Sequence, residues 1–179
     1  MSDVVKLSKL MSLVLRHKPG AIGINLDENG WADVGELIEG IRRKGHACFE
    51  FATLEEVVAT NNKQRFSFNA DCTKIRANQG HSLKADVELP EATPPVYLYH
   101  GTATRFLDSI MQDGLVRKSR LHVHLSLDKK TAMTVGSRHG NAVVLSVRAR
   151  EMHRAGHKFY LSVNGVWLTD SVPVRYIGY

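Results

Sequence analysis

Polar side chains alternate with apolar ones between residues 120 and 126, a spacing that could place several reactive groups together. The polar positions are Arg120, His122, His124 and Ser126. Because successive side chains of a β-strand point to opposite faces, a strand here would expose these four groups on one face and bury the residues between them. A guanidinium and two imidazoles on one face could bind phosphate or transfer a proton. A strand that merely faces solvent has the same alternation, so both interpretations stay open.

The histidines at 122 and 124 also have the spacing of a metal site, because one strand can present two imidazoles to the same ion. A catalytic metal would need a further ligand, and the available groups are His100, Asp128, Glu151 and Asp170. No recognisable spacing selects one of them. A metal-dependent hydrolase is therefore a weak alternative.

His100 ends a predicted apolar strand, 96–100, that continues into Gly101 and Thr102. Small residues at a turn allow main-chain N–H groups to approach a ligand closely. A single histidine in such a place is more often structural, so this pattern indicates a binding site only together with others.

The first half of the chain offers a second set of cationic candidates. Arg16 and His17 end a predicted helix, where the helix dipole favours cations for purely structural reasons. That explanation suits Arg65 less well. On the predicted strand 64–68 it faces away from Phe66 and Phe68, so its side chain could meet a phosphate.

The distribution of charge favours a polyanionic ligand. Residues 1–90 hold twelve basic and twelve acidic residues, whereas residues 91–179 hold twelve basic and six acidic ones, together with six of the nine histidines. A polar loop around Gly80 could hydrogen-bond a nucleic-acid backbone, although such loops are commonly only solvated. Its polar residues are Arg76, Gln79, His81 and Ser82.

Composition excludes several classes of protein. Of 179 residues, 43% are hydrophobic and 23% charged, values typical of a globular protein, and no apolar run reaches the roughly 18 residues of a membrane span. The N-terminal apolar run is interrupted by Lys6 and Lys9 and lacks the features of a signal peptide, so we expect a cytoplasmic protein. Cys48 and Cys72 are too few and too far apart for a disulfide scaffold or a cysteine-rich zinc site.

Periodicity predicts three short helices and a hairpin in the first half. The helices are an apolar stripe from Leu7 to Leu15, one with Asp33 as N-cap, and one that begins with a capping box at Thr53. Residues 64–68 and 73–77 alternate as a hairpin. Three helices followed by a hairpin are typical of a winged-helix module.

A Pro-rich, non-periodic segment at 81–95 predicts a linker, with the boundary near residue 90 between domains 1–90 and 91–179. Beyond it we expect short strands and only two helices, 104–112 and about 128–135. The strands are 96–100, 121–126, 142–147, 159–163 paired with 166–169 across Asn164-Gly165, and 174–177. The predicted fold class is α+β, with a mostly antiparallel β domain behind a helical module.

The chain resembles the NAD-dependent RNA 2′-phosphotransferases, which remove an internal 2′-phosphate from RNA, as in tRNA splicing. Eight segments in family order carry the resemblance over nearly the whole chain. They are Leu15-Arg16-His17-Lys18-Pro19, Asp27-Glu28-Asn29-Gly30-Trp31, Arg65-Phe66, Arg76-Ala77-Asn78-Gln79-Gly80-His81-Ser82, Leu98-Tyr99-His100-Gly101-Thr102, His122-Val123-His124-Leu125-Ser126, Val135-Gly136-Ser137-Arg138 and Asn164-Gly165-Val166-Trp167-Leu168-Thr169. The resemblance implies a winged-helix-like N-terminal lobe that binds RNA and an ADP-ribosyltransferase-like C-terminal lobe that binds NAD, with the active site between them.

The resemblance also implies roles for individual residues. The catalytic set would be Arg16, His17, Arg65 and Arg120, with Arg117 as the competitor of Arg120. The cofactor-binding set would be His100, Gly101, Thr102, Ser126, Gly136 and Arg138, and the RNA-binding set Arg76, Gln79, His81 and Ser82. Val166 stands where many protein-modifying ADP-ribosyltransferases have a glutamate, which argues against protein modification.

The implied reaction has two steps. The RNA 2′-phosphate attacks the nicotinamide ribose of NAD to give a 2′-phospho-ADP-ribosylated RNA, and a ribose hydroxyl then takes the phosphate. The products are 2′-OH RNA, ADP-ribose 1″,2″-cyclic phosphate and nicotinamide. The arginines would hold the phosphate and stabilise its charge, and His17 would move a proton. NAD is then a co-substrate, no metal is required, and we expect a monomer without membrane contact. The alternative is a non-catalytic winged-helix nucleic-acid-binding protein.

Overall fold

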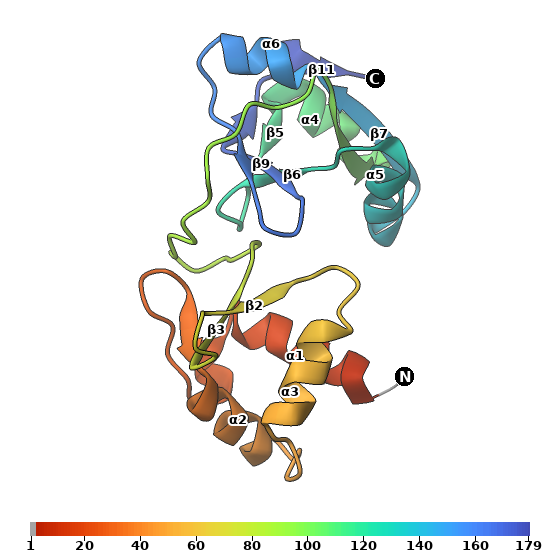
Figure 1. Ribbon diagram of the computed structural model, residues 1–179. Coiled ribbons are helices and arrows are strands. Elements are labelled where there is room, and N and C mark those ends of the chain that lie inside the picture. The colour runs from red at the N-terminus through yellow and green to blue at the C-terminus, as the bar shows by residue number, and fades with distance from the viewer. Residues whose placement is uncertain (1–2) are drawn as a thin grey trace. The chain divides into compact units, whose positions relative to one another are not determined.

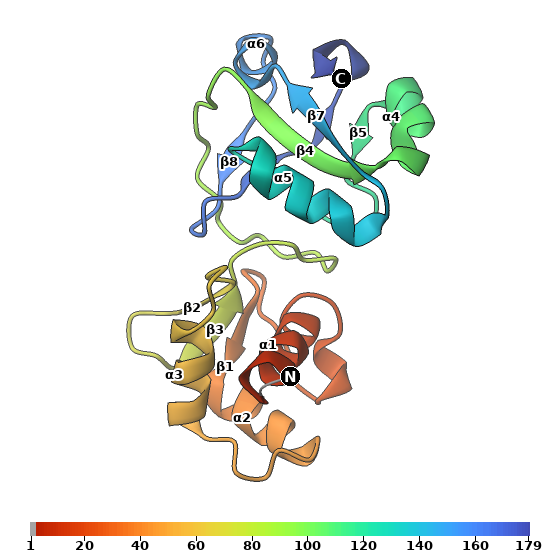
Figure 2. The ribbon, with the colours of Figure 1, turned by 90° about the vertical axis from the view of Figure 1, so that its right-hand side faces the viewer.

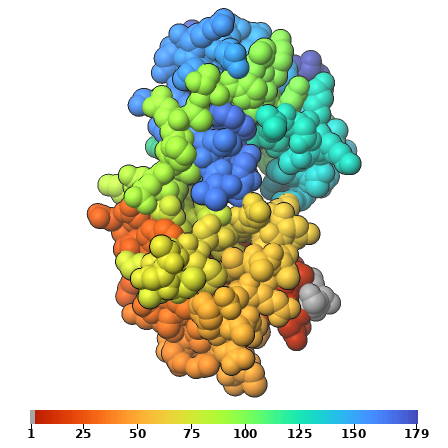
Figure 3. Space-filling model, in the orientation of Figure 1, coloured from red at the N-terminus to blue at the C-terminus, as the bar shows by residue number. Residues whose placement is uncertain are grey.

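The computed structural model describes residues 3–179. It divides into two compact units, one that ends at Glu88 and one from Leu89 to Tyr179. The red, orange and yellow residues gather in the first unit, and the green and blue residues in the second (Figure 1, Figure 3). Each unit has its own hydrophobic core.

Helices α1 (Asp3–Val14), α2 (Val34–Arg43) and α3 (Phe51–Ala59) form one side of the first unit, and a 3-10 turn at Pro19–Ala21 follows α1. The N-cap role of Asp33 is confirmed, because its carboxylate accepts the N–H of Glu36 at 2.9 Å. The expected start of α3 at Thr53 is wrong, since the helix begins two residues earlier with Glu50 as N-cap. Phe51 packs against Phe68 of the hairpin in a tilted arrangement with ring centroids 5.8 Å apart, and this contact supports the two extra residues.

A three-stranded antiparallel sheet completes the first unit. Its strands are β1 (Trp31–Asp33), β2 (Phe66–Phe68) and β3 (Lys74–Ala77), in the order β1-β3-β2. The hairpin of β2 and β3 is confirmed, with Phe66 opposite Ala77 and Phe68 opposite Ile75. Strand β1 was not expected, because three residues are too few to show an alternating pattern. The sheet and α1–α3 enclose one core that includes Met11, Leu37 and Leu54.

The predicted linker at 81–95 is partly built into the first unit. Ala85 and Val87 are buried, and the N–H of Asp86 donates to the carbonyl of Glu28 at 2.8 Å. These side chains pack beside Gly30, whose φ of 76° lies in the left-handed region that favours glycine and where a Cβ would come within 3.2 Å of Nε2 of His81. Their small size explains why periodicity did not reveal them.

The second unit contains three small antiparallel sheets. The first has the order β11-β7-β4, with β4 (Leu98–Ala103), β7 (Ala142–Val147) and β11 (Ile177–Gly178). The second has the order β6-β9-β8, with β6 (Val123–Leu125), β8 (Tyr160–Leu161) and β9 (Trp167–Thr169). The third pairs β5 (Leu115–Val116) with β10 (Ser171–Val172). The hairpin across Asn164-Gly165 is confirmed by the pairing of β8 with β9.

Three helices accompany these strands, one more than expected. They are α4 (Leu107–Asp113), which follows a 3-10 turn at Thr104–Phe106, α5 (Lys129–Gly136) and α6 (Ala149–Arg154). Helix α5 runs beside β4, as Figure 2 shows. With six residues, α6 is too short to display helical periodicity. The strand expected at 174–177 is largely wrong, because residues Val174–Tyr176 form a 3-10 turn after Pro173.

Within residues 3–179, none of the helices combines the length and the apolar character that crossing a membrane would require.

Candidate active site

Arg16 and His17 lie in the turn that ends α1, and the segment around Ser82 holds both. The N–H of His17 donates to the carbonyl of Leu13 at 2.9 Å and so prolongs the helical turn. The N–H of Ser82 donates to the carbonyl of Arg16 at 3.0 Å, and the Ser82 hydroxyl lies 2.9 Å from Nδ1 of His17. Both side chains of this last pair are exposed. A solvent-accessible imidazole is thereby fixed in orientation by a residue distant in sequence.

Arg65 lies just before β2, and the segment that follows β3 holds its main chain. The N–H of Asn78 donates to the carbonyl of Arg65 at 2.8 Å. Residues 78 and 82 thus bind Arg65 and Arg16 at the two ends of one five-residue segment, which can span at most roughly 14 Å when fully extended. One short segment of the first unit therefore contacts Arg16, His17 and Arg65.

His81, predicted to bind RNA, has a buried side chain with 1% exposure. Burial lowers the pKa of His81 to about 4, and the charges of Arg16, His17 and Arg76 act in the same direction. At neutral pH the imidazole is therefore uncharged. It fills the interior beneath these cations and does not form part of the surface that a nucleic acid could reach.

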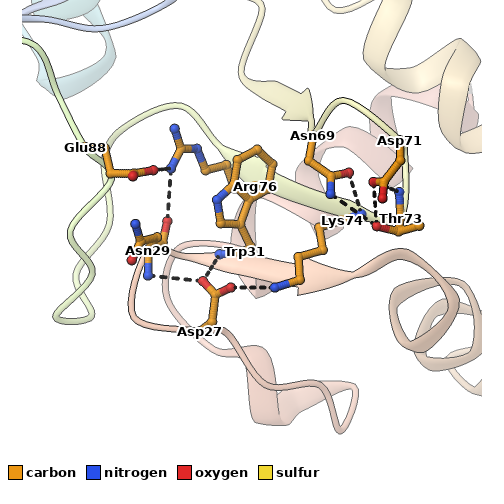
Figure 4. Close-up of polar contacts among 9 residues, drawn as sticks. All are labelled: Asp27, Asn29, Trp31, Asn69, Asp71, Thr73, Lys74, Arg76 and Glu88. Atoms are coloured by element: carbon orange, nitrogen blue, oxygen red, sulfur yellow. Dashed lines mark hydrogen bonds and ion pairs between the residues drawn. The ribbon is translucent and has the colours of Figure 1, made fainter.

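Arg76, also predicted to bind RNA, is engaged within the first unit (Figure 4). Its guanidinium stacks on Trp31, 4.3 Å from the ring centroid, and contacts Glu88 at 3.0 Å. It also donates to the carbonyl of Asn29 at 3.4 Å, and its side chain is only 15% exposed. These contacts give Arg76 a structural role that the sequence pattern did not indicate. Of the loop candidates, Ser82 is exposed and Gln79 half-buried.

The turn beside Arg76 is built on Asp27 (Figure 4). Its carboxylate accepts the N–H groups of Asn29 and Trp31 at 3.1 and 2.9 Å and pairs with Lys74 at 3.0 Å. Burial raises the pKa of Asp27, but these bonds outweigh it and hold the pKa below its usual value. The Asp27–Trp31 segment of the motif is thus mainly architectural.

In the second unit the predicted strand 121–126 is shorter than expected. Only residues 123–125 form β6, so Arg120 and His122 precede it in irregular backbone. The apolar alternation is confirmed, since Val123 and Leu125 are buried. Arg120 lies 3.4 Å from Nδ1 of His124, whereas His122 packs against Tyr160 with ring centroids 5.5 Å apart.

Arg117, the competitor of Arg120, lies in the same turn, where its carbonyl accepts the N–H of Arg120 at 3.0 Å. Its NH1 donates to the carbonyl of Leu121 at 3.4 Å. Together with Asp170 it lines an open depression beside β5 and β10. Arg120 has the imidazole of His124 among its hydrogen-bond partners.

His100 on β4 has a defined tautomer. Its Nδ1 lies 3.0 Å from the carbonyl of His124, and because a carbonyl only accepts, Nδ1 must carry the proton. Burial lowers the pKa of His100, and Arg120 and His139 lower it further against the effect of the carbonyl. The neutral ring therefore presents Nε2 as a hydrogen-bond acceptor, a group that suits the hydroxyls of a ribose.

The glycines predicted to contact a cofactor are required by packing. Gly101 lies within β4, where a Cβ would overlap the carbonyl of Ala132 in α5. A Cβ on Gly136 would lie 2.7 Å from the carbonyl of Thr102. The close approach expected at Gly101 is thus an approach of helix α5 to strand β4.

The other residues predicted to bind the cofactor differ in exposure. Thr102 is buried, Ser126 is half-buried and paired with Tyr99, and Arg138 is exposed.

In the part of the chain that the structure describes, no three His, Cys, Asp or Glu side chains cluster in a way that could hold a metal ion. Two asparagines that were not expected to be buried, Asn61 and Asn78, have 8% and 5% exposure and bind the segment carrying Arg65. Asparagine in a polar stretch is typical of a surface turn, so the sequence contained no signal of their burial.

Comparison with known proteins shows the family of the chain. The model of the RNA 2′-phosphotransferase, Tpt1 / KptA family matches residues 2–171. The chain belongs to the RNA 2′-phosphotransferase family. A probable RNA 2′-phosphotransferase of Flavobacterium johnsoniae is 56% identical over 171 residues, which cover 96% of this chain and 93% of that protein. Probable RNA 2′-phosphotransferases of Burkholderia lata and Fusobacterium nucleatum are 53% and 51% identical over 98% and 99% of this chain and 90% and 99% of theirs.

An RNA 2′-phosphotransferase is an enzyme that uses NAD as co-substrate to remove a 2′-phosphate from RNA. The family membership decides against the non-catalytic alternative. The acceptor nitrogen of His100 fits the ribose of NAD, and the cationic residues of the first unit fit a phosphate.

Proposed function

We propose that Arg16, His17, Arg65 and Arg120 act on the 2′-phosphate of the RNA. The observation that carries the proposal is the segment 78–82, which binds the main chain of Arg65 at one end and that of Arg16 at the other. A phosphate dianion is already nucleophilic, so the protein has to hold it in line against the charge of NAD. Guanidinium groups suit this task because they bind phosphate oxygens bidentately.

NAD supplies the ribose that accepts the phosphate, and its nicotinamide leaves as a neutral molecule without needing a general acid. In the first step the arginines orient the phosphate. In the second step charge builds on the phosphoryl oxygens, and the same guanidinium groups stabilise it. The ribose hydroxyl that attacks phosphorus must lose a proton, and Nε2 of His17 is the group that we assign to take it.

The contact of Ser82 with His17 supports this assignment. A serine hydroxyl both accepts and donates, so it can accept a hydrogen bond from Nδ1–H of the imidazole. In that tautomer Nε2 is unprotonated and acts as a base. After it has taken the proton, the ring still donates to Ser82, so the same bond persists in both protonation states.

On the second unit we assign NAD binding to His100, Ser126 and Arg138, together with main-chain groups near Gly101, Thr102 and Gly136. The neutral His100 ring offers an acceptor for a ribose hydroxyl, and the exposed Arg138 offers a cation for the pyrophosphate. Because packing against α5 already requires the glycines to be small, their part in NAD binding is limited to the main chain. His122 and His124 have supporting roles.

We further propose that the first unit is a winged-helix-like lobe that binds the RNA, and the second an ADP-ribosyltransferase-like lobe that binds NAD. Three helices with a three-stranded antiparallel sheet support the first assignment. The exposed Ser82 and half-buried Gln79 are the loop groups placed to contact RNA, whereas Arg76 and His81 support the loop from within. The natural substrate would be a tRNA-like RNA, and the enzyme would act in the cytoplasm as a monomer.

The deciding experiment incubates the protein with an RNA oligonucleotide bearing one internal 2′-phosphate, NAD and excess EDTA. We expect 2′-OH RNA, nicotinamide and ADP-ribose 1″,2″-cyclic phosphate in equal amounts. An RNA without the 2′-phosphate should release no nicotinamide. Activity that EDTA abolishes and a divalent cation restores would point to a metal ion and contradict the proposal.

A further inference from the structure

Asn61 is a buried amide whose contacts converge on Arg65. It follows α3 and has 8% exposure. Its Oδ1 accepts from the N–H of Arg65 at 3.3 Å, from NH1 of the Arg65 guanidinium at 3.2 Å and from the N–H of Lys63 at 3.3 Å. Its Nδ2 donates to the hydroxyl of Ser8 on α1 at 2.8 Å. Three donors around one atom identify that atom as the carbonyl oxygen of the amide.

The backbone between Asn61 and Arg65 is turned sharply. Gln64 has a φ of 42°, in the left-handed region that a residue with a side chain seldom adopts. The N–H of Gln64 donates to the carbonyl of Asn61 at 2.7 Å, and its own carbonyl accepts from Nδ2 of Asn78 at 2.6 Å. Two buried asparagines thus hold this turn from both sides, and Asn61 also reaches the Arg65 side chain.

The contact with α1 connects this turn to the rest of the unit. Ser8 lies on the helix whose end carries Arg16 and His17. The amide of Asn61 therefore links the helix of one cationic pair to the guanidinium of the third cation. Because a buried amide is costly to leave unsatisfied, each of its bonds restricts the others, and the whole network has one favourable arrangement.

We propose that Asn61 is a positioning residue that holds the Arg65 guanidinium ready to bind the 2′-phosphate of the RNA. An arginine that is ordered before the substrate arrives loses less conformational entropy when it binds. A guanidinium has five N–H donors, so one bond to Asn61 remains compatible with bidentate binding of a phosphate. This inference rests on the proposed role of Arg65 in phosphate binding.

The test compares the affinity of the protein for one RNA oligonucleotide with and without an internal 2′-phosphate, in the absence of NAD. The ratio of the two dissociation constants measures recognition of the phosphate alone. We expect Asn61→Ala to reduce this ratio about tenfold, the effect of one charge-assisted contact. Binding of the unphosphorylated RNA should stay unchanged, which a merely structural role of Asn61 does not predict.

A double-mutant cycle shows whether Asn61 acts through Arg65. Arg65→Ala should reduce the ratio, and Asn61→Ala should reduce it no further in that background. Multiplicative effects of the two substitutions would overturn the inference while leaving Arg65 as a phosphate ligand. An unchanged ratio in Arg65→Ala would overturn the proposed role of Arg65, and the inference with it.

Asn61→Asp covers the case in which Asn61→Ala does not fold. The carboxylate keeps an acceptor for all three donors, and the Ser8 hydroxyl can reverse its bond and donate to it. Its charge would compete with the phosphate for Arg65, so the ratio should fall although the fold is kept. The matched control is Asn69→Asp, because the Asn69 side chain bonds to neighbours in its own turn, among them the N–H of Lys74 and the hydroxyl of Thr73. If Asn61→Asp retains the wild-type ratio, the inference is wrong.

Discussion

Nδ1 of His17 lies 2.9 Å from the hydroxyl oxygen of Ser82, although 65 positions separate the two residues in the chain. The contact orients a solvent-accessible imidazole so that its Nε2 can take up a proton. We expect His17→Ala to impair the second step most, because the phosphate in the first step needs no base. The 2′-phospho-ADP-ribosylated RNA should then accumulate, and gel analysis of a single turnover would detect it.

Ser82→Ala provides a graded comparison with His17→Ala. The imidazole remains but loses its orienting bond, so we expect the second step to slow only by about tenfold. Ser82→Thr keeps the hydroxyl and should restore the rate. If neither His17→Ala nor Ser82→Ala changes the partition between intermediate and product, His17 is not the group that moves the proton.

Arg120 and Arg117 should differ in their effect on catalysis. Arg120 contacts His124, whereas Arg117 contacts the carbonyl of Leu121. We expect Arg120→Ala to lower kcat by about a hundredfold or more, the usual loss when a donor that stabilises the transition state is removed. Arg117→Ala should retain most of the activity, and nicotinamide release measures both. The reverse order would exchange the roles of the two arginines.

The stability of the first unit should depend on pH through His81. Because burial lowers its pKa to about 4, the unfolded chain binds more protons than the native state between pH 4 and about pH 6.5. Stability should therefore rise with pH through this window and be fully present above it. A shift of this size corresponds to about 3 kcal/mol.

Urea unfolding at several pH values measures this contribution. Trp31 lies in the first unit and Trp167 in the second, so a Trp167→Phe background makes fluorescence report on the first unit alone. In His81→Gln the rise of stability between pH 4 and 6.5 should become much smaller. An equally steep rise in the variant would assign the pH dependence to other groups.

Gly101→Ala should strongly destabilise the second unit. The added Cβ would overlap the carbonyl of Ala132, which belongs to the backbone of α5 and cannot rotate away. We expect a loss of more than about 3 kcal/mol, at the upper end of the range for overpacked sites. Unfolding followed by Trp167 fluorescence in a Trp31→Phe background measures it. The reference is the same Trp31→Phe protein with Gly101 unchanged. Equal stability of the second unit with and without Gly101→Ala would show that α5 can move away from β4.

The sequence by itself determined those features that local chemistry dictates. The side chain of Asp33 caps α2, the polar residues 69–73 turn the hairpin between Phe66 and Ala77, and Asn164-Gly165 turns the second hairpin. The N-cap and the two hairpin turns depend on residues that are close in the sequence, so the sequence alone predicts them. The ordered motifs around Arg16, Arg65 and His122 likewise identified the family, because their combination over the full length is specific.

Tertiary structure alone decided which polar residues are buried within the fold and which stay exposed. His81 and Ser82 are adjacent in the same motif, yet one ring is buried beneath the cations and the other side chain orients His17. Arg76 is paired with Trp31 and Glu88, and Asn61 reaches Arg65 from a turn that looks merely solvated in the sequence. The physical reason is that burial and hydrogen bonding depend on which distant segments meet. The type of a side chain determines which hydrogen bonds it can make. Which partner it bonds to depends on the fold.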